Sequence, residues 1–131
     1  AGLMAARYEW AFVMACDMPF LNRGLAHYMS GLMPDHAANP CAANPCAAIV
    51  PRWQGELETL HAFYSRACLS AIEPILHRGG GRIVEFYKRV RVRYVEPDEI
   101  AHFDPEGLSF FNINSPQEWE QAQGLARHKP V

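Results

Sequence analysis

An unbroken apolar run followed by a single carboxylate constrains this chain more than any other stretch. Six small or apolar residues extend from Ala11 to Cys16, Asp17 follows directly, and Pro19 comes two residues later. A short apolar run bounded by a breaker predicts a buried strand of a parallel sheet, covered on both faces. Open α/β sheets place ligands beyond the carboxyl ends of their strands. The run therefore predicts an α/β fold with Asp17 at a ligand-binding edge.

The position of Asp17 alone supports two interpretations. A carboxylate at a strand end is a suitable ligand for Mg²⁺, which prefers oxygen donors. Asp-x-Pro is equally ordinary turn chemistry, and Asp is a common residue at a helix N-cap. The local sequence therefore leaves open whether Asp17 holds a metal ion or shapes a turn.

Composition limits the class of protein and its partners. The chain has 131 residues, of which 50% are hydrophobic and 20% charged, so we expect residues 1–131 to form one globular domain. A net charge of −2 gives no reason to expect nucleic acid or a membrane surface as a partner, and no apolar run is long enough to span a bilayer. The start of the chain does not resemble a signal peptide. The four cysteines form no C-x-x-C pair, which predicts free thiols in the cytoplasm rather than a zinc site.

Hydrophobic periodicity predicts alternating helices and strands along the rest of the chain. Asn22 is expected to cap a helix whose apolar face includes Leu25 and Met29, and a duplicated Ala-Ala-Asn-Pro-Cys segment predicts a loop over 35–47. Glycines 79–81 are expected to end a helix, although they could also approach an anion. The other predicted elements are strands at 47–51, 57–64 and 89–95, a turn at 52–56, a helix at 66–77 capped by Ser65 with Leu76 facing inward, and a short helix at 83–88.

The last predicted strand carries two amides on one face. It covers 108–114 and ends with Asn112 and Asn114, after which Ser115-Pro116-Gln117-Glu118 predicts a capping box and a helix over 117–126 with Trp119 inward. A helix N-terminus favours anions, so these amides could lie beside a phosphate, although Asn is also a common turn residue. A strand-end Asp together with strand-end Asn residues makes a functional site as well supported as turn chemistry.

Three segments resemble the MobA-like nucleotidyltransferases. Residues 13–21 (Val-Met-Ala-Cys-Asp-Met-Pro-Phe-Leu) resemble the metal-binding strand of that family, residues 60–64 (Leu-His-Ala-Phe-Tyr) its mid-chain strand, and residues 111–118 (Phe-Asn-Ile-Asn-Ser-Pro-Gln-Glu) its closing Asn-x-Asn-Thr-Pro-Glu signature. The order and spacing of the segments also agree. The resemblance implies a three-layer, Rossmann-like α/β fold of the nucleotide-diphospho-sugar transferase type.

The family also implies a reaction and a set of site residues. The reaction joins GMP from GTP to the terminal phosphate of molybdopterin, with Mg²⁺ as cofactor and release of pyrophosphate. Asp17 would be the catalytic metal ligand, and Asn112 and Asn114 would contact the pterin phosphate or the reacting phosphates. Arg82 matches a family Arg expected near phosphate, and His61 could face the substrate cleft, as could Glu58. Molybdoenzymes or other cofactor-biosynthesis proteins would be possible partners.

One departure from the family pattern affects the expected activity. No Gly-rich loop with a nearby Lys, which in the family holds the nucleotide, precedes Asp17. We therefore expect the chain to lack the N-terminal nucleotide-binding strands, to expose an apolar edge at strand 11–16, and to be inactive or nearly so by itself. Two alternatives stay open: a cytidylyl- or sugar-phosphate nucleotidyltransferase, and a non-catalytic molybdopterin-binding adaptor.

Overall fold

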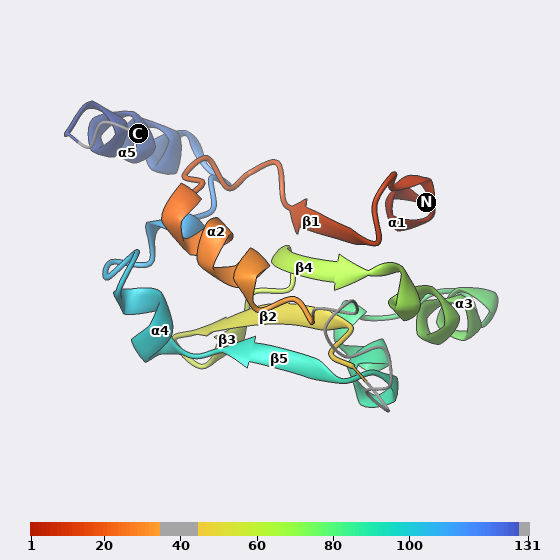
Figure 1. The fold of residues 1–131 in the computed structure, drawn as a ribbon. Helices are drawn as coiled ribbons and strands as arrows, with labels where there is room; N and C mark the ends of the chain where they lie inside the picture. Colours follow the sequence, from red (N-terminus) through yellow and green to blue (C-terminus); the bar gives the residue numbers. More distant parts are fainter. Residues whose placement is uncertain (35–44, 129–131) are drawn as a thin grey trace.

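The computed structural model describes residues 1–34 and 45–128 and shows a sheet with helices on both faces (Figure 1). Most of the predicted loop at 35–47 lies outside these residues. The described elements, in chain order, are α1 (Gly2–Ala5), β1 (Trp10–Met14), α2 (Arg23–Gly31), β2 (Ala48–Trp53), β3 (Glu56–Leu57), β4 (His61–Ser65), the 3₁₀ turn η1 (Arg66–Cys68), α3 (Leu69–His77), the 3₁₀ helix η2 (Ile83–Arg89), β5 (Val92–Val95), α4 (Pro97–Ala101), η3 (Leu108–Phe110) and α5 (Pro116–His128).

The sheet is mixed, with β2 near its centre. In the described part of the chain β2 pairs with β4 antiparallel and with β5 parallel, and β4 in turn pairs antiparallel with β1. β3 closes a hairpin onto the end of β2, with Arg52 opposite Leu57. Parallel pairing of β2 and β5 requires a crossover, and the connection through β4, α3 and η2 supplies it.

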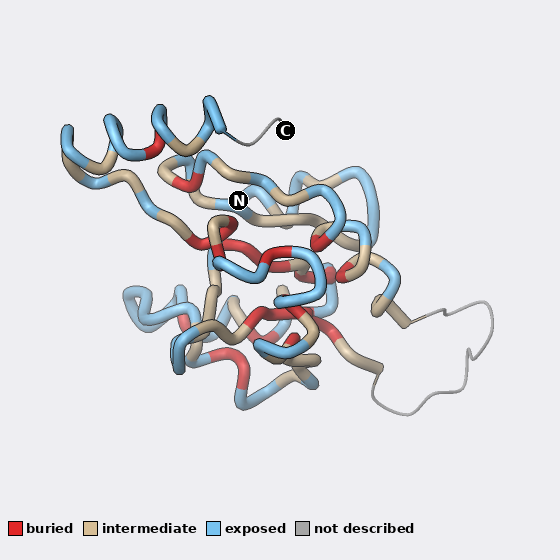
Figure 2. Tube along the Cα trace, turned by 90° about the vertical axis from the view of Figure 1, so that its left-hand side faces the viewer, coloured by how far each residue is buried: buried red, intermediate tan, exposed pale blue. Residues whose placement is uncertain are grey.

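Alternate residues of each strand build two cores on opposite faces of the sheet. Ala62 and Tyr64 of β4 face the layer formed by α3 and η2, whereas Phe63 faces the layer formed by α2, α4 and η3. The strand periodicity of two residues produces this division. Figure 2 shows the buried residues gathered in the sheet and its flanking helices, with α5 largely exposed. The architecture is the predicted three-layer α/β fold.

Two local predictions are confirmed by hydrogen bonds and dihedral angles. The Asn22 side chain accepts a hydrogen bond from the backbone N–H of Leu25 at 2.9 Å, so Asn22 is the N-cap of α2. Gln54 and Gly55 both have positive φ, at 49° and 84°, which is the backbone of a two-residue hairpin turn compatible with the right-handed twist of its strands. The turn predicted at 52–56 is therefore a tight hairpin.

The prediction that strand 11–16 is a buried strand of a parallel sheet is wrong. β1 is antiparallel to β4, ends at Met14, and is paired on one side only in the described part of the chain. Its residues are half-buried, and Met14 is 38% exposed. A short apolar run reports burial but not strand direction, which the partner strand decides. The expected apolar strand edge is present.

The predicted strand over 108–114 is also wrong. Residues 108–110 form η3, which follows Gly107 at a φ of +65°, and residues 111–114 continue without a sheet partner. Trp119 and Leu76, predicted to face inward, are 54% and 59% exposed, because α5 turns Ala122, and α3 turns Ala71 and Ile75, toward the body. Ser65 precedes a 3₁₀ turn and makes no side-chain cap hydrogen bond.

Three cysteines lie in the described residues, and all three are free thiols. Burial raises the pKa of the Cys68 thiol to about 11, and its Sγ donates a hydrogen bond to the Ala47 carbonyl at 3.2 Å. Cys68 is therefore a packing residue rather than a nucleophile. No helix of the described chain combines the length and the hydrophobicity that crossing a bilayer requires.

Candidate active site

Asp17 lies just beyond the carboxyl end of β1, where backbone contacts on both sides fix its loop. The Ala15 N–H donates to the Leu60 carbonyl at 2.9 Å, which extends the pairing of β1 with the β4 side by one residue. The Met18 N–H turns back to the Ala15 carbonyl at 3.3 Å, and the Met18 side chain is buried. Asp17 is half-buried between the exposed Cys16 and the buried Met18. The fold thus holds the Asp17 backbone firmly while solvent still reaches the residue.

The segment that carries Asn112 and Asn114 runs alongside the Asp17 loop. The Ile113 N–H donates to the Asp17 carbonyl at 2.9 Å, so residues 96 positions apart in sequence meet here. Asn112 and Asn114 flank Ile113, and both are exposed. The structure therefore brings together the carboxylate and the two amides that the sequence singled out, although the amides lie on an irregular segment rather than a strand.

The N-terminus of α5 follows these amides, but it already has an acidic partner. Ser115 Oγ accepts from the Glu118 N–H at 3.2 Å, and the Glu118 carboxylate accepts from the Asn114 N–H at 2.7 Å. The predicted capping arrangement is present in modified form, since Glu118 bonds to Asn114 rather than to the N-cap residue itself. A carboxylate at this position competes with an external anion for the positive end of the helix.

His61 lies in the core rather than in a cleft. It is fully buried, its ring packs edge-on against Phe12 and Phe110 at centroid distances of 5.1 and 5.2 Å, and neither ring nitrogen has a hydrogen-bond partner. Burial lowers the pKa of His61 to about 4, partly opposed by the charge of Asp104. His61 is a neutral core residue whose ring does not reach a surface where substrate could bind.

Arg82 and Asp17 lie at opposite ends of the sheet. Arg82 is in the exposed segment between α3 and η2, which follows the carboxyl end of β4, whereas Asp17 follows the carboxyl end of the antiparallel β1 (Figure 1). The backbone N–H of Arg82 donates to Glu85 at 3.0 Å, and Gly79 and Gly80 adopt positive φ where α3 ends. The structure does not bring Arg82 to the site formed by Asp17 and the amides.

Glu58 faces a separate acidic hollow. This hollow of about 340 Å³ includes Trp53, Glu56, Glu58 and Phe111. Burial raises the pKa of Glu58, and the nearby charge of Glu56 adds to the effect. Repulsion among its carboxylates makes the hollow unsuited to phosphate.

Two residues near Asp17 were not identified from the sequence. Arg23 begins α2, six residues after Asp17, and places an exposed cation on the same connection. Asp104 is a buried carboxylate on the segment that faces this connection. The neighbouring Phe103 carbonyl accepts a hydrogen bond from the Asn22 side chain at 2.9 Å, which joins the two segments. Neither Arg23 nor Asp104 belongs to a segment that the sequence singled out as a candidate site.

The donor set at Asp17 fits Mg²⁺ bound with a substrate. No cluster of three or more His, Cys, Asp or Glu capable of holding a metal ion occurs among residues 1–34 and 45–128. Mg²⁺ is usually held by only one or two carboxylates, together with water and substrate phosphates. A lone half-buried carboxylate beside two exposed amides is compatible with such a site, and it does not resemble a closed structural metal centre.

The fold, with Asp17 and the Asn112–Asn114 segment together at one edge of the sheet, defines a Rossmann-like nucleotidyltransferase architecture. Sequence comparison identifies the family. Residues 1–92 match the family described as the MobA-like NTP transferase domain. The chain belongs to the MobA-like NTP transferases, as its Asp17 and Asn112–Asn114 motifs predicted.

Individual relatives and a solved structure agree with this assignment. The molybdenum cofactor guanylyltransferase of Desulfosudis oleivorans is 38% identical over 97% of this chain and 58% of its own length. The enzyme of that name from Syntrophotalea carbinolica is 31% identical over 98% of this chain and 60% of its own length. The crystal structure of molybdopterin-guanine dinucleotide biosynthesis protein A from Archaeoglobus fulgidus superposes with a TM-score of 0.72 at 25% identity, covering 92% of this chain and 57% of that one. The chain thus spans less than two thirds of the length of these relatives.

Proposed function

We propose that this chain is the substrate- and metal-binding part of an enzyme that transfers GMP from GTP to molybdopterin. The contact between the Asp17 loop and the Asn112–Asn114 segment carries the proposal, because it assembles the two most specific family motifs at one edge of the sheet. The names of the relatives supply the reaction. GTP and molybdopterin are the proposed substrates.

The chain's own residues would act by positioning and by charge. Asp17 would hold Mg²⁺, which when bound would neutralise charge on the reacting phosphates. The exposed amides of Asn112 and Asn114 would donate hydrogen bonds to phosphate oxygens, and Arg23 would offer a cation on the same connection. Nucleotidyl transfer requires alignment of the reacting groups and charge stabilisation more than covalent help from the protein. A metal carboxylate, amide donors and a cation are the types of group that supply these two effects.

We further propose that the 131-residue chain has little transfer activity by itself. No Gly-rich loop with a Lys precedes Asp17, and His61 and Arg82 contribute nothing at the Asp17 edge. The chain therefore offers few groups that could hold the triphosphate of a nucleotide.

The test is a chimera in which the N-terminal segment of the Desulfosudis oleivorans relative is fused ahead of Ala1. We expect the chimera to transfer GMP from GTP to molybdopterin with Mg²⁺, and Asp17→Ala to lower the rate by at least about 100-fold, because a metal carboxylate contributes several kcal/mol to transition-state stabilisation. Asp98→Ala, at an exposed Asp on α4, is the matched control and should leave the rate unchanged. The transfer rate is also measured for the chain without the fused segment, and for the chimera with CTP in place of GTP.

The outcomes separate the parts of the proposal. A folded chimera without transfer, under conditions where the relative itself is active, would contradict guanylyl transfer. Asp17→Ala activity within a few-fold of the unsubstituted chimera would show that Asp17 does not hold the metal. A preference for CTP would replace the guanylyl donor with a cytidylyl donor.

A further inference from the structure

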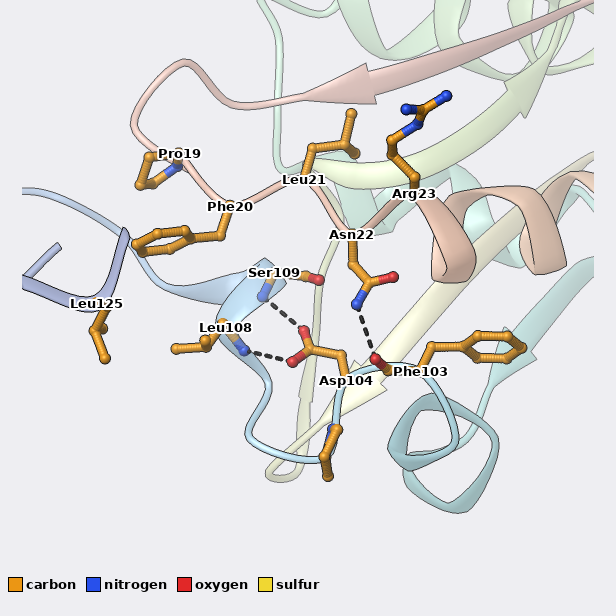
Figure 3. Close-up of a pocket in the computed structure, with 11 residues that line it drawn as sticks. Pro19, Phe20, Leu21, Asn22, Arg23, Phe103, Asp104, Leu108, Ser109 and Leu125 are labelled. Carbon is orange, nitrogen blue, oxygen red and sulfur yellow. Dashed lines mark hydrogen bonds between the residues drawn. The ribbon is translucent and has the colours of Figure 1, made fainter. Parts of the chain in front are cut away.

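A hollow of about 380 Å³ lies beside the Asp17 loop, and none of the site residues predicted from the sequence lines it (Figure 3). One wall is the connection Pro19–Arg23, the opposite wall is the segment from Phe103 to Ser109, and α5 contributes Leu125. Its volume falls within the range of about 300–1,000 Å³ typical of small-molecule sites. The hollow is therefore large enough for one small ring system.

Most of the lining is apolar and partly aromatic. Phe20, Leu108 and Leu125 form one side, and Figure 3 shows the Phe20 ring and the two leucine side chains on the same side of the hollow. The Phe20 ring is held edge-on by Phe111, with centroids 6.1 Å apart. Such a lining suits the face of a flat ring, because aromatic and aliphatic groups gain most from covering an apolar surface.

The buried polar part of the lining is the Asp104 carboxylate, held in a fixed orientation, with Ser109 beside it. Asn22 and the exposed Arg23 belong to the opposite wall. Asp104 is 5% exposed, and its two oxygens accept the backbone N–H groups of Leu108 and Ser109 at 3.0 and 2.7 Å. Among the described residues no cationic side chain forms a salt bridge with it. Each carboxylate oxygen has a second acceptor position, so Asp104 retains the capacity to accept a pair of N–H donors. Ser109 beside it has a buried hydroxyl without a hydrogen-bond partner.

We propose that this hollow binds the 2-amino-4-oxopyrimidine ring that pterins and guanine share. That ring presents an N–H and an amino group side by side, which is the donor pair that a carboxylate accepts in bidentate fashion. The Phe20 side of the hollow covers the ring face, and Asp104 fixes the ring edge. The inference rests on the proposed function for the choice of ring but not for the hollow or for Asp104.

Chain connectivity relates the hollow to the site at Asp17. Pro19 on one wall lies two residues after Asp17, and Ser109 on the other wall lies three residues before Asn112. Both walls therefore lead directly into the two segments that meet through the Ile113–Asp17 hydrogen bond. A ring bound here would have its phosphate-bearing substituent free to extend toward Asp17 and the amides.

The first arm of the test compares three ligands by calorimetry on the 131-residue chain. The ligands are 6-hydroxymethylpterin, guanosine and lumazine, in which an oxygen replaces the 2-amino group of a pterin. We expect 6-hydroxymethylpterin, guanosine or both to bind at least about tenfold more tightly than lumazine, since lumazine places an acceptor against the carboxylate. The pterin and guanosine arms distinguish the two sources of the ring.

The second arm uses matched variants. Asp104→Asn should weaken binding at least about tenfold and abolish the preference over lumazine, because the charged acceptor pair is lost. Leu125→Trp should fill the hollow and block binding without disturbing the core, since Leu125 is half-exposed on α5. Leu76→Trp, on the exposed face of α3, is the control and should bind as the unsubstituted chain does. Leu125→Trp keeps the test decisive if Asp104→Asn does not fold.

Three results would overturn the inference: no binding of either ring at about 1 mM, equal binding of lumazine, or unchanged binding by Leu125→Trp. Failure here is distinct from failure of the proposed function. If the hollow binds the ring but the folded chimera does not transfer GMP, only the proposed guanylyl transfer is wrong. If the chimera transfers GMP but its Leu125→Trp variant still binds the ring normally, only the proposed ring site is wrong.

Discussion

At the scale of single residues, Asp17 and His61 show how differently two motif residues can be placed. Both belong to segments that resemble the family, yet Asp17 lies half-buried at a sheet edge and His61 lies in the core. A one-residue step along a strand turns a side chain to the other face, and the partner elements decide which face is covered. The motif alone identified both residues as candidates, and only packing separated them.

The buried imidazole of His61 makes a pH-dependent contribution to stability. Its folded pKa of about 4 lies below the ordinary value of 6.5, so the unfolded chain binds the extra proton between these two pH values. Stability that is present above pH 6.5 should therefore be lost as the pH falls through 6.5 toward 4, by on the order of 3 kcal/mol. The measurement is the free energy of unfolding in urea between pH 7.5 and 4.

Two substitutions test the assignment of this loss to His61. His61→Leu should flatten the pH dependence in that window, whereas the exposed His77→Gln should leave it unchanged. An equally steep loss of stability in His61→Leu would contradict the assignment.

At the scale of elements, the capped helix and the hairpin turn were predictable because their signals are local. Asn22 and the Gln54-Gly55 turn act on backbone groups within a few residues. Residues 108–114 were assigned wrongly because an apolar run with β-formers also suits a 3₁₀ turn that packs one ring into the core. Phe110 does so at 7% exposure, beside Trp53. Tertiary packing overrode the strand propensity of this segment.

Asn22 also links elements far apart in sequence. Its oxygen caps α2, and its amide nitrogen donates to the Phe103 carbonyl at 2.9 Å, which ties α2 to the segment after α4. We expect Asn22→Ala to lower the free energy of unfolding by about 1–2 kcal/mol, since a cap and a second hydrogen bond are lost. Urea denaturation followed by circular dichroism measures the change.

Asn22→Ser separates the two contributions. Serine keeps an acceptor for the cap but is too short to reach the Phe103 carbonyl, so it should recover roughly half of the loss. If Asn22→Ser were as unstable as Asn22→Ala, the cap would not be a source of stability.

At the scale of the whole molecule, β1 is the weak point. It pairs only with β4 in the described chain, and Met14 at its end is 38% exposed. An unpaired apolar strand edge is a template for pairing with another chain. We expect concentration-dependent self-association, measurable by sedimentation velocity, and we expect Met14→Lys to reduce it because a charged edge residue opposes strand pairing.

Leu76→Lys is the matched control, because Leu76 is exposed on α3 at the other end of the sheet and should not affect association. A chain that stays monomeric at about 1 mM, or an equal effect of both lysines, would show that association does not occur through β1.

The sequence alone predicted the family and, through the resemblance to it, the three-layer class and the candidate site motif, because the Asp17 and Asn112–Asn114 segments are matched by their own residues and by their order along the chain. The tertiary structure decided strand direction, the burial of His61, the distance of Arg82 from the site, and the hollow beside Asp17. Each of these depends on which distant segment covers a given face. Asp104 illustrates the reason: its importance comes from burial between two loops about 80 residues apart, which no local pattern encodes.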